Sequence, residues 1–148
     1  MTGTSPPVVG ARVATPEDRA QVDRLRHLAE EEVRSGRGGA ALLAEHVVPD
    51  GALVLVGTIG PVVVGQLTLE LVPAGPSRVA ELYVEPEARG VGVGAALVAL
   101  ALERCRTAGS TSVDAEALPG DRATKNFFEA YGFVTRRLTV RRDLGPAD

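Results

Sequence analysis

The spacing of apolar residues divides the chain into short β-rich runs and longer amphipathic stretches. Runs of β-branched residues between Gly and Pro turns predict strands over 8–14, 53–59, 62–72, 78–84, 111–117 and 133–142. Apolar residues three or four apart, with capping and stop signals, predict helices over 15–34, 40–46, 93–108 and 121–131. The predicted strands of the first half are therefore mostly joined by hairpins, whereas strands and helices alternate in the second half.

Two of these segments carry information about burial. Residues 67–71 alternate Leu with Thr and Glu, which predicts that one face of that strand meets water. The first half of the helix over 93–108 is almost entirely apolar, which predicts a helix buried on most sides.

The order of the elements predicts one α+β domain. Hairpins come first and make most of the sheet antiparallel, and one strand–helix–strand crossover over Arg78–Ala117 must then set two strands parallel. We expect a mixed sheet with helices on both faces, formed by residues 8–144 after a flexible tail of residues 1–7.

Composition narrows the class of protein. The chain has 148 residues, 45% of them hydrophobic, which suits one domain with a real core. A net charge of −3 argues against a general nucleic-acid binder, and a single cysteine excludes an internal disulfide. The longest apolar run, Ala95–Leu102, is too short for a membrane span, and the start of the chain lacks a leader pattern. We expect a cytoplasmic protein that binds neither nucleic acid nor membranes.

Charge is divided unevenly between the two halves. Residues 1–88 carry a net charge of −5, and residues 89–148 carry +2. Chance scatter of solvated charges is the better explanation of the split by itself, so the split gains meaning only if a motif places an anion in the second half.

The stretch Arg89-Gly-Val-Gly-Val-Gly94 is the most informative motif. Glycines at 90, 92 and 94 would let backbone N–H groups approach a ligand, and the following helix would point its unpaired N–H groups at the same place. Such an arrangement binds phosphate or diphosphate, and Arg89 would add a permanent positive charge.

Two other phosphate motifs fit less well. A Walker loop needs Gly-Lys-Ser or Gly-Lys-Thr before its helix, whereas Gly94 is followed by two alanines. Gly90, Gly92 and Ala95 match a dinucleotide fingerprint, but residues 85–89 separate it from the strand end, and the chain has room for one clear crossover unit.

The sequence over 82–94, LYVEPEARGVGVG, resembles the central motif of the GNAT superfamily of N-acetyltransferases. Arg89, Gly92 and Gly94 occupy the Arg and Gly positions of that motif. The later stretch over 127–133, FFEAYGF, is similar to the second block of the family, a helix that ends in Gly-Phe.

This resemblance implies an acetyl-CoA site between two parallel strands that splay apart. The backbone of Leu82, Tyr83 and Val84 would pair with the pantetheine arm. The N–H groups of residues 89–94 (Arg89, Gly90, Val91, Gly92, Val93 and Gly94) would hold the diphosphate. Lys125 and Asn126 would reach the pantetheine or a phosphate, although both also suit solvated helix positions.

The resemblance also suggests catalytic groups. Transfer to a primary amine, whose pKa is about 10, needs a base, and some family members carry a glutamate on the strand that holds Glu81. A solvent-facing charge is the alternative role of Glu81, and Glu116 on the neighbouring strand is a second candidate base.

The family's usual tyrosine acid is replaced by Phe128, so Tyr131, Tyr83 or water would protonate the leaving thiolate. Tyr131 is the first choice, with packing at a helix end as its alternative role. Cys105 and both histidines suit packing or surface positions, and we expect no metal.

Function and assembly follow from these observations as hypotheses. The first is direct acetyl transfer from acetyl-CoA to a small-molecule or peptide amine. The alternative, prompted by Phe128, is a non-catalytic acyl-CoA sensor. A single strand after the second block leaves a sheet edge open, which predicts a homodimer.

Overall fold

The computed structural model of the protein describes residues 8–36, 38–117 and 122–146. The strands are β1 (Val9–Val13), β2 (Leu53–Ile59), β3 (Val62–Glu70), β4 (Pro76–Val84) and β5 (Ser112–Ala115). The helices are α1 (Arg19–Arg34), α2 (Gly39–Glu45), α3 (Val93–Ala108) and α4 (Arg122–Ala130). The predicted tail over 1–7 and the predicted start of α4 at Asp121 lie outside the described residues.

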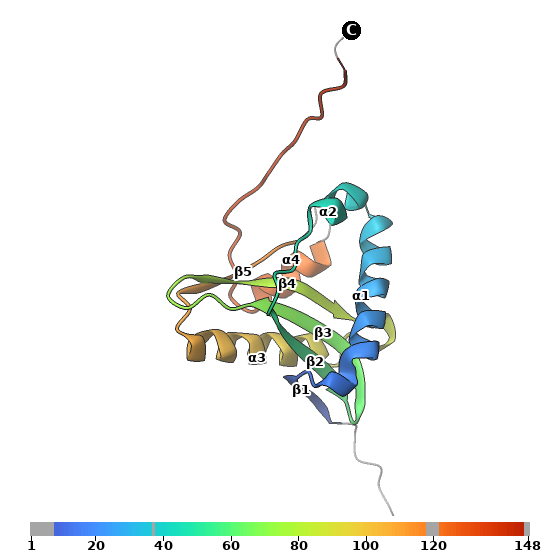
Figure 1. Ribbon diagram of the computed structural model, residues 1–148, viewed down its shortest axis with the longest axis vertical. Helices are drawn as coiled ribbons and strands as arrows, with labels where there is room; N and C mark the ends of the chain where they lie inside the picture. The colour runs from blue at the N-terminus through green and yellow to red at the C-terminus, as the bar shows by residue number, and fades with distance from the viewer. Residues whose placement is uncertain (1–7, 37, 118–121, 147–148) are drawn as a thin grey trace, which may run out of the picture.

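The five strands form a single sheet whose spatial order is the order of the chain (Figure 1). β1 to β4 are antiparallel neighbours, and β4 and β5 are parallel and connected through α3. The predicted α+β architecture with one crossover is therefore confirmed. None of the described helices is both long and apolar enough to span a bilayer.

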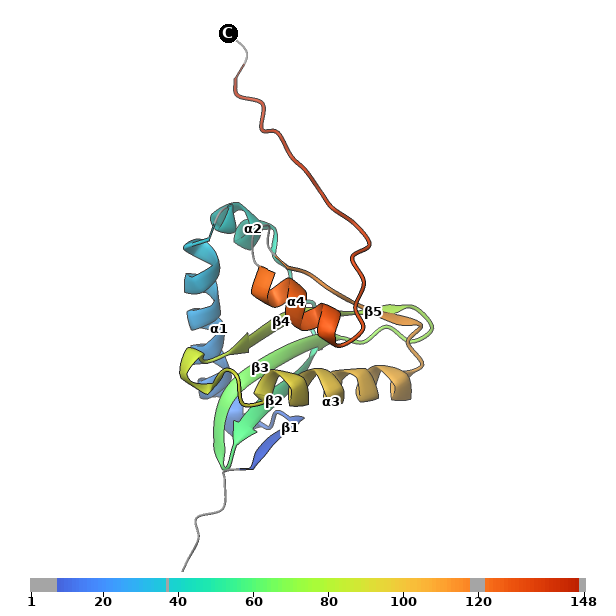
Figure 2. The same ribbon diagram turned by 180° about the vertical axis from the view of Figure 1, so that it is seen from behind.

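An apolar cluster lies on each face of the sheet. On one face, Val22 and Leu25 of α1 pack against Val56 and Tyr83. On the other, α3 packs against residues such as Leu55 and Leu67, and α4 adds Phe128. Figure 2 shows α3 and α4 from the side where they cover the sheet. The sheet is therefore the middle layer of three.

The prediction that one face of residues 67–71 meets water is wrong. Thr68 is fully buried, like its neighbours Leu67 and Leu69. The reason is that α1 lies across this face and Arg26 donates a hydrogen bond to the Thr68 hydroxyl at 2.9 Å. The polar side chain of Thr68 thus makes a contact between α1 and the sheet and does not face solvent.

β4 separates from β5 halfway along its length. The two strands pair from Pro76 with Ser112 to Val79 with Ala115, and β5 then ends. At the same point the register of β3 and β4 skips Ala80, because Thr68 faces Glu81 while Leu69 faces Val79. A one-residue bulge bends a strand and increases its twist. The edge of β4 over 80–84 is thereby left without a neighbouring strand among the described residues.

The predicted last strand over 133–142 is also wrong. Residues 133–146 are irregular, and they run away from the body of the protein in both views (Figures 1 and 2). The direction of departure is fixed at the end of α4, where Phe133 N–H bonds to Phe128 O and Gly132 has a φ of +86°. A strand needs a neighbour, and this exit carries the segment away from one.

The entry into α1 depends on an ion pair between the exposed Arg12 and the buried Asp18. Arg12 donates to both carboxylate oxygens of Asp18, at 2.7 and 3.0 Å, and the Thr15 N–H donates to Asp18 Oδ2 at 2.7 Å. Thr15 is the N-cap residue of this turn, as the sequence predicts, and it forms a capping box with Asp18. The hydrogen bond from Arg12, followed by that from Thr15, holds the pKa of Asp18 well below its usual value.

We expect Asp18→Asn to lower the free energy of unfolding at pH 7 by about 1–2 kcal/mol, because a cap and a charged hydrogen bond are lost. A depressed native pKa contributes stability above the unfolded carboxyl pKa of about 3.9 and loses it as pH falls. The difference between wild type and variant should therefore shrink from about pH 5 downward. Urea denaturation against pH measures it, with the exposed neighbour Glu17→Gln as control; a pH-independent difference would contradict the assignment.

Candidate active site

The glycine-rich turn ends at the first residue of α3. Gly90 and Gly92 have φ of +85° and +102°, the left-handed region that glycine favours, and a Cβ at either would face open space. Gly92 is the N-cap of α3, and its carbonyl accepts the first helical bond, from Ala96 N–H at 3.0 Å. The N–H groups of residues 93–95 precede that bond and have no acceptor within the helix. The turn therefore presents an open, positively polarised backbone surface.

Gly94 has a packing role in addition to the predicted one. A Cβ on Gly94 would lie 3.1 Å from two ring atoms of Phe127, so this glycine makes room for α4. Gly57 similarly makes room for α3, because its Cβ would lie 2.5 Å from Val93 Cγ1. The side chain of Val93 is buried in this contact, which leaves only its N–H group for a ligand. Close packing of α3 and α4 thus fixes the position of the turn.

Arg89 is held at the end of β4. Its Nε donates to Val84 O at 2.8 Å, its Nη2 donates to Glu32 at 3.0 Å, and its guanidinium lies over the Tyr83 ring at 5.4 Å. Tyr83 is buried, and desolvation, followed by the charge of Glu32, raises the pKa of its phenol. Arg89 therefore joins the turn to α1 as well as supplying a charge next to it.

The other predicted cofactor-binding residues lie on β4, in the glycine-rich turn and on α4. Leu82 and Val84 are half-buried on the part of β4 that has no strand beside it. Val91 is exposed in the turn, and Asn126 is exposed on α4. The structure thus gathers the strand edge, the glycine turn and the start of α3 at one end of the sheet, with α4 packed beside them.

Glu81 lies on the α1 face and is held by three residues. Its Oε1 accepts from Arg26 Nε at 2.9 Å and from Thr68 Oγ1 at 3.0 Å, and its Oε2 lies 3.3 Å from His46 Nε2. The side chain is 18% exposed, so the solvent-facing role is wrong. Because Arg26 and Thr68 occupy Oε1, Oε2 on the His46 side is the oxygen available to an incoming group.

Gln66 completes this network underneath. Its side chain is fully buried, and its Nε2 has no hydrogen-bond partner, while its Oε1 accepts from Thr68 Oγ1 at 2.9 Å. The Thr68 hydroxyl has one proton and two acceptors, Gln66 and Glu81. Rotating the Gln66 amide by a half turn lets its NH2 donate to Thr68, which releases the Thr68 proton for Glu81. We favour that orientation.

Tyr131 lies on the other face of the sheet from Glu81. Its ring contacts Phe127 at a centroid distance of 5.0 Å, and Phe127 in turn covers Gly94. Tyr131 is 39% exposed at the end of α4, whereas Phe128 is a core residue with 6% exposure. No contact between described residues joins Tyr131 to Glu81, so the structure does not bring the two predicted catalytic groups together.

The remaining candidates are placed more simply. Glu116 is exposed just beyond β5. Cys105 is buried, and desolvation raises the pKa of its thiol, as expected for a packing residue. Among the described residues, no three of the His, Cys, Asp and Glu side chains gather as a metal site would need.

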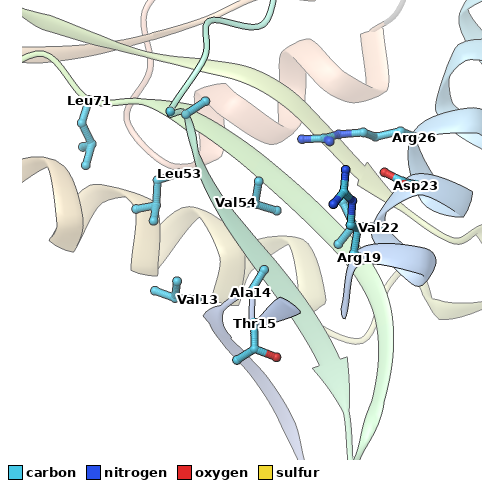
Figure 3. Close-up of a pocket in the computed structure, with 12 residues that line it drawn as sticks. Val13, Ala14, Thr15, Arg19, Val22, Asp23, Arg26, Leu53, Val54 and Leu71 are labelled. Carbon is cyan, nitrogen blue, oxygen red and sulfur yellow. The ribbon is translucent and has the colours of Figure 1, made fainter. Parts of the chain in front are cut away.

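A cavity of about 570 Å³ lies elsewhere, between α1 and the start of β2 (Figure 3). Arg19, Asp23 and Arg26 of α1 line one side of it, and Leu53 and Val54 line the other. It adjoins the Glu81 network through Arg26 and through Val54, which is paired with Thr68 in the register of β2 and β3. The glycine turn and α4 do not line it.

The sequence missed Arg26, Thr68, Gln66 and His46. Each is far in sequence from Glu81, and their meeting depends on how α1 and the segment after α2 cross the sheet. The one available signal was Thr68 itself, a polar residue in the middle of an apolar strand.

Comparisons with known proteins give the following. Residues 19–133 match the model of the acetyltransferase (GNAT) family. No curated protein matches the chain. Among solved structures, the tetramutant of the BH1408 protein from Bacillus halodurans is 18% identical, with a TM-score of 0.76 and coverage of 90% of this chain and 99% of that one.

Two further structures are similar. A ribosomal-protein-alanine N-acetyltransferase from Brucella melitensis biovar Abortus 2308 is 16% identical, with a TM-score of 0.69 and coverage of 93% and 100%. The aminoglycoside N-acetyltransferase AAC(6')-Iy, solved in complex with CoA, is 15% identical, with a TM-score of 0.69 and coverage of 91% and 99%. At these identities the likeness concerns the fold.

Proposed function

Because the chain belongs to the acetyltransferase (GNAT) family, we propose that it transfers an acetyl group from acetyl-CoA directly to a primary amine. The observation that carries the proposal is the divergence of β4 from β5 opposite the glycine-led start of α3. This arrangement offers a thioester carrier two backbone surfaces at once, a strand edge for an amide-bearing arm and helix N–H groups for a diphosphate.

The proposed cofactor contacts use backbone more than side chains. The N–H groups of residues 90–94 would hold the diphosphate, where a helix N-terminus favours negative charge. The unpaired edge of β4 over 82–84 would bond the two amides of pantetheine, as a neighbouring strand would. The bound thioester supplies an activated acetyl group and a thiolate leaving group. Asn126 and Arg89 remain candidates for contacts to phosphate or ribose.

Glu81 is the proposed base. The amine nitrogen forms a bond to the acetyl carbon, the C–S bond breaks, and one proton leaves the nitrogen for Glu81 Oε2. Arg26 and Thr68 hold the other oxygen and so fix the carboxylate in place. His46, with a third of its side chain exposed, stands between Oε2 and solvent and could pass the proton on.

The thiolate needs one proton in return, from Tyr131, Tyr83 or water. The raised pKa of Tyr83 keeps its phenol protonated at neutral pH, but the ring is buried under Arg89. Tyr131 is more exposed, and it lies beside the ring that covers the first turn of α3. We therefore keep Tyr131 as the first candidate.

A non-catalytic acyl-CoA sensor of the same fold is the second candidate function. It is favoured by the core position of Phe128, where a proton donor would otherwise be expected. The two functions share the cofactor site and differ only in whether the acetyl group leaves.

An amine panel with acetyl-CoA separates them. The neighbours named above act on aminoglycosides and on a ribosomal-protein alanine, so the panel contains aminoglycosides, polyamines and peptides with free α-amines. We expect thiol release well above background with at least one acceptor class, measured with a thiol reagent. Tight CoA binding with no release on any amine would favour the sensor.

We expect Gly92→Glu to abolish CoA binding, because it adds a side chain and a negative charge at the turn that would hold the diphosphate. The matched control is Gly109→Glu at the opposite end of α3, where the glycine also has positive φ (+81°) and open space around its Cβ. Isothermal titration should show CoA binding retained in Gly109→Glu and lost in Gly92→Glu, with both folded by circular dichroism. Equal affinity in the two variants would remove the turn from the site.

We expect Glu81→Gln to lower kcat and flatten the rise of rate with pH, because an amide cannot accept the proton of the amine. Glu85→Gln, four residues further along, is the control, since Glu85 pairs with Arg24 instead. The assay is kcat/KM against pH with the acceptor found in the panel. A wild-type profile in Glu81→Gln would exclude Glu81 as the base.

A further inference from the structure

The cavity between α1 and the start of β2 has the size and the lining of a small-molecule site (Figure 3). Its volume of about 570 Å³ lies within the range of about 300–1,000 Å³ that is usual for ligand pockets. Leu53, Val54 and Leu71 form its apolar part, and all three are only half-buried. Pockets of this kind hold the apolar body of a ligand and fix its orientation with a few polar groups.

Two of the charged side chains that line the cavity are unpaired. Arg19 and Asp23 are four residues apart on α1, a spacing at which opposite charges can pair. No ion pair joins them, and neither bonds to another residue within the described parts of the chain. A guanidinium and a carboxylate thus line the cavity with their hydrogen-bonding groups unused.

Arg26 supplies a second guanidinium, which is only partly used. Of its five N–H donors, Nε serves Glu81 and Nη2 serves Thr68, each at 2.9 Å. Its Nη1 donates to no atom among residues 8–36, 38–117 and 122–146. Figure 3 shows the guanidinium groups of Arg19 and Arg26 on the side of α1 that faces Val54. Because guanidinium donors bind a carboxylate in pairs, Arg19 and Arg26 form a site for one.

Asp23 narrows the class of ligand. It repels a simple carboxylate but attracts a molecule that carries an ammonium next to its carboxylate. A free α-amino acid carries both charges on one carbon, whereas each end of a peptide carries only one of them. The apolar part of the cavity favours an amino acid with an apolar side chain.

We infer that this cavity is a second ligand site, which binds a free α-amino acid with an apolar side chain. The carboxylate of the amino acid lies between Arg19 and Arg26, and its ammonium lies at Asp23. Its side chain covers the apolar part of the cavity. The ammonium is thus directed to Asp23 and not to Glu81, so the bound amino acid is not the acetyl acceptor.

The site is connected to the proposed base through Arg26. A carboxylate at Arg26 Nη1 competes with Glu81 for the charge of this guanidinium and weakens the bond that holds Glu81 Oε1. We therefore expect occupancy of the cavity to lower the rate of acetyl transfer. This consequence rests on the proposed function, whereas the binding of the amino acid does not.

Isothermal titration without CoA tests the binding. We expect L-phenylalanine to bind with a dissociation constant below about 1 mM. Hydrocinnamate, which lacks the ammonium, and phenethylamine, which lacks the carboxylate, should each bind at least about tenfold more weakly, because each loses a charged hydrogen bond. No binding of phenylalanine, or equal affinity for all three compounds, would overturn the inference.

Two substitutions assign the two charges. Arg19→Gln should weaken the binding of phenylalanine and of hydrocinnamate alike, by about tenfold, whereas Asp23→Asn should weaken that of phenylalanine only. The matched control is Arg34→Gln at the far end of α1, where Arg34 pairs with Glu30 outside the cavity. Arg19, Asp23 and Arg34 are exposed, so all three variants should fold. The site is wrong if Asp23→Asn weakens both compounds equally or if Arg19→Gln weakens neither.

The rate of acetyl transfer tests the connection to Glu81. With the acceptor found in the amine panel, phenylalanine should lower kcat/KM in wild type and have no effect on it in Arg19→Gln. Mass spectrometry should show phenylalanine itself unmodified, because acetylated phenylalanine would overturn its assignment as a second ligand. An unchanged rate in wild type, despite binding, would overturn the connection through Arg26. If no amine is acetylated, the titration without CoA still decides whether the cavity binds an amino acid.

Discussion

The site depends on one constraint in the backbone, the bulge at Ala80 where β4 parts from β5. Up to Val79 the two strands are ordinary parallel neighbours, and one residue later the edge of β4 has no strand to bond. An unbonded strand edge inside a protein is costly unless something else satisfies it. The start of α3 reaches the same end of the sheet because Gly57 lets Val93 come within packing distance. The bulge at Ala80 and the absence of a side chain at Gly57 thus bring the unpaired edge of β4 and the free N–H groups at the start of α3 to the same end of the sheet.

The sheet also divides the chemistry between its faces. Glu81, with Arg26, Thr68 and His46, belongs to the α1 face, whereas Phe127 and Tyr131 lie with α3 and α4. A reaction that uses groups from both faces must take place where the sheet is open, which is between β4 and β5.

Most of the secondary structure and the glycine-rich turn could be predicted from the sequence, because both depend on local patterns. Strand and helix positions follow from local periodicity, and the glycine turn follows from a local motif, so α3 was predicted at its observed bounds. The network around Glu81 could not be predicted, because Arg26 and His46 are 55 and 35 residues away and meet it only through tertiary packing. The packing role of Gly94 could not be predicted, because the ring of Phe127 that lies next to it comes from a later helix. Residues 133–142 have a strand's pattern, but pairing is decided by neighbours, which periodicity does not describe.

The replacement of the expected phenol by Phe128 is tolerable because the leaving thiolate is a much weaker base than an amine anion. A thiol has a pKa of about 8.5, so a thiolate departs without protonation at little cost. An amine anion, the conjugate base of a neutral amine, is far more basic and does not leave. A nitrogen that keeps its extra proton, however, leaves again as neutral amine, and the reaction reverts. Removing that proton is therefore the demanding step. Arg26, Thr68 and His46 hold the carboxylate of Glu81, the proposed base, whereas Phe128 is a core residue. The proposed reaction would therefore depend more on its base than on its acid.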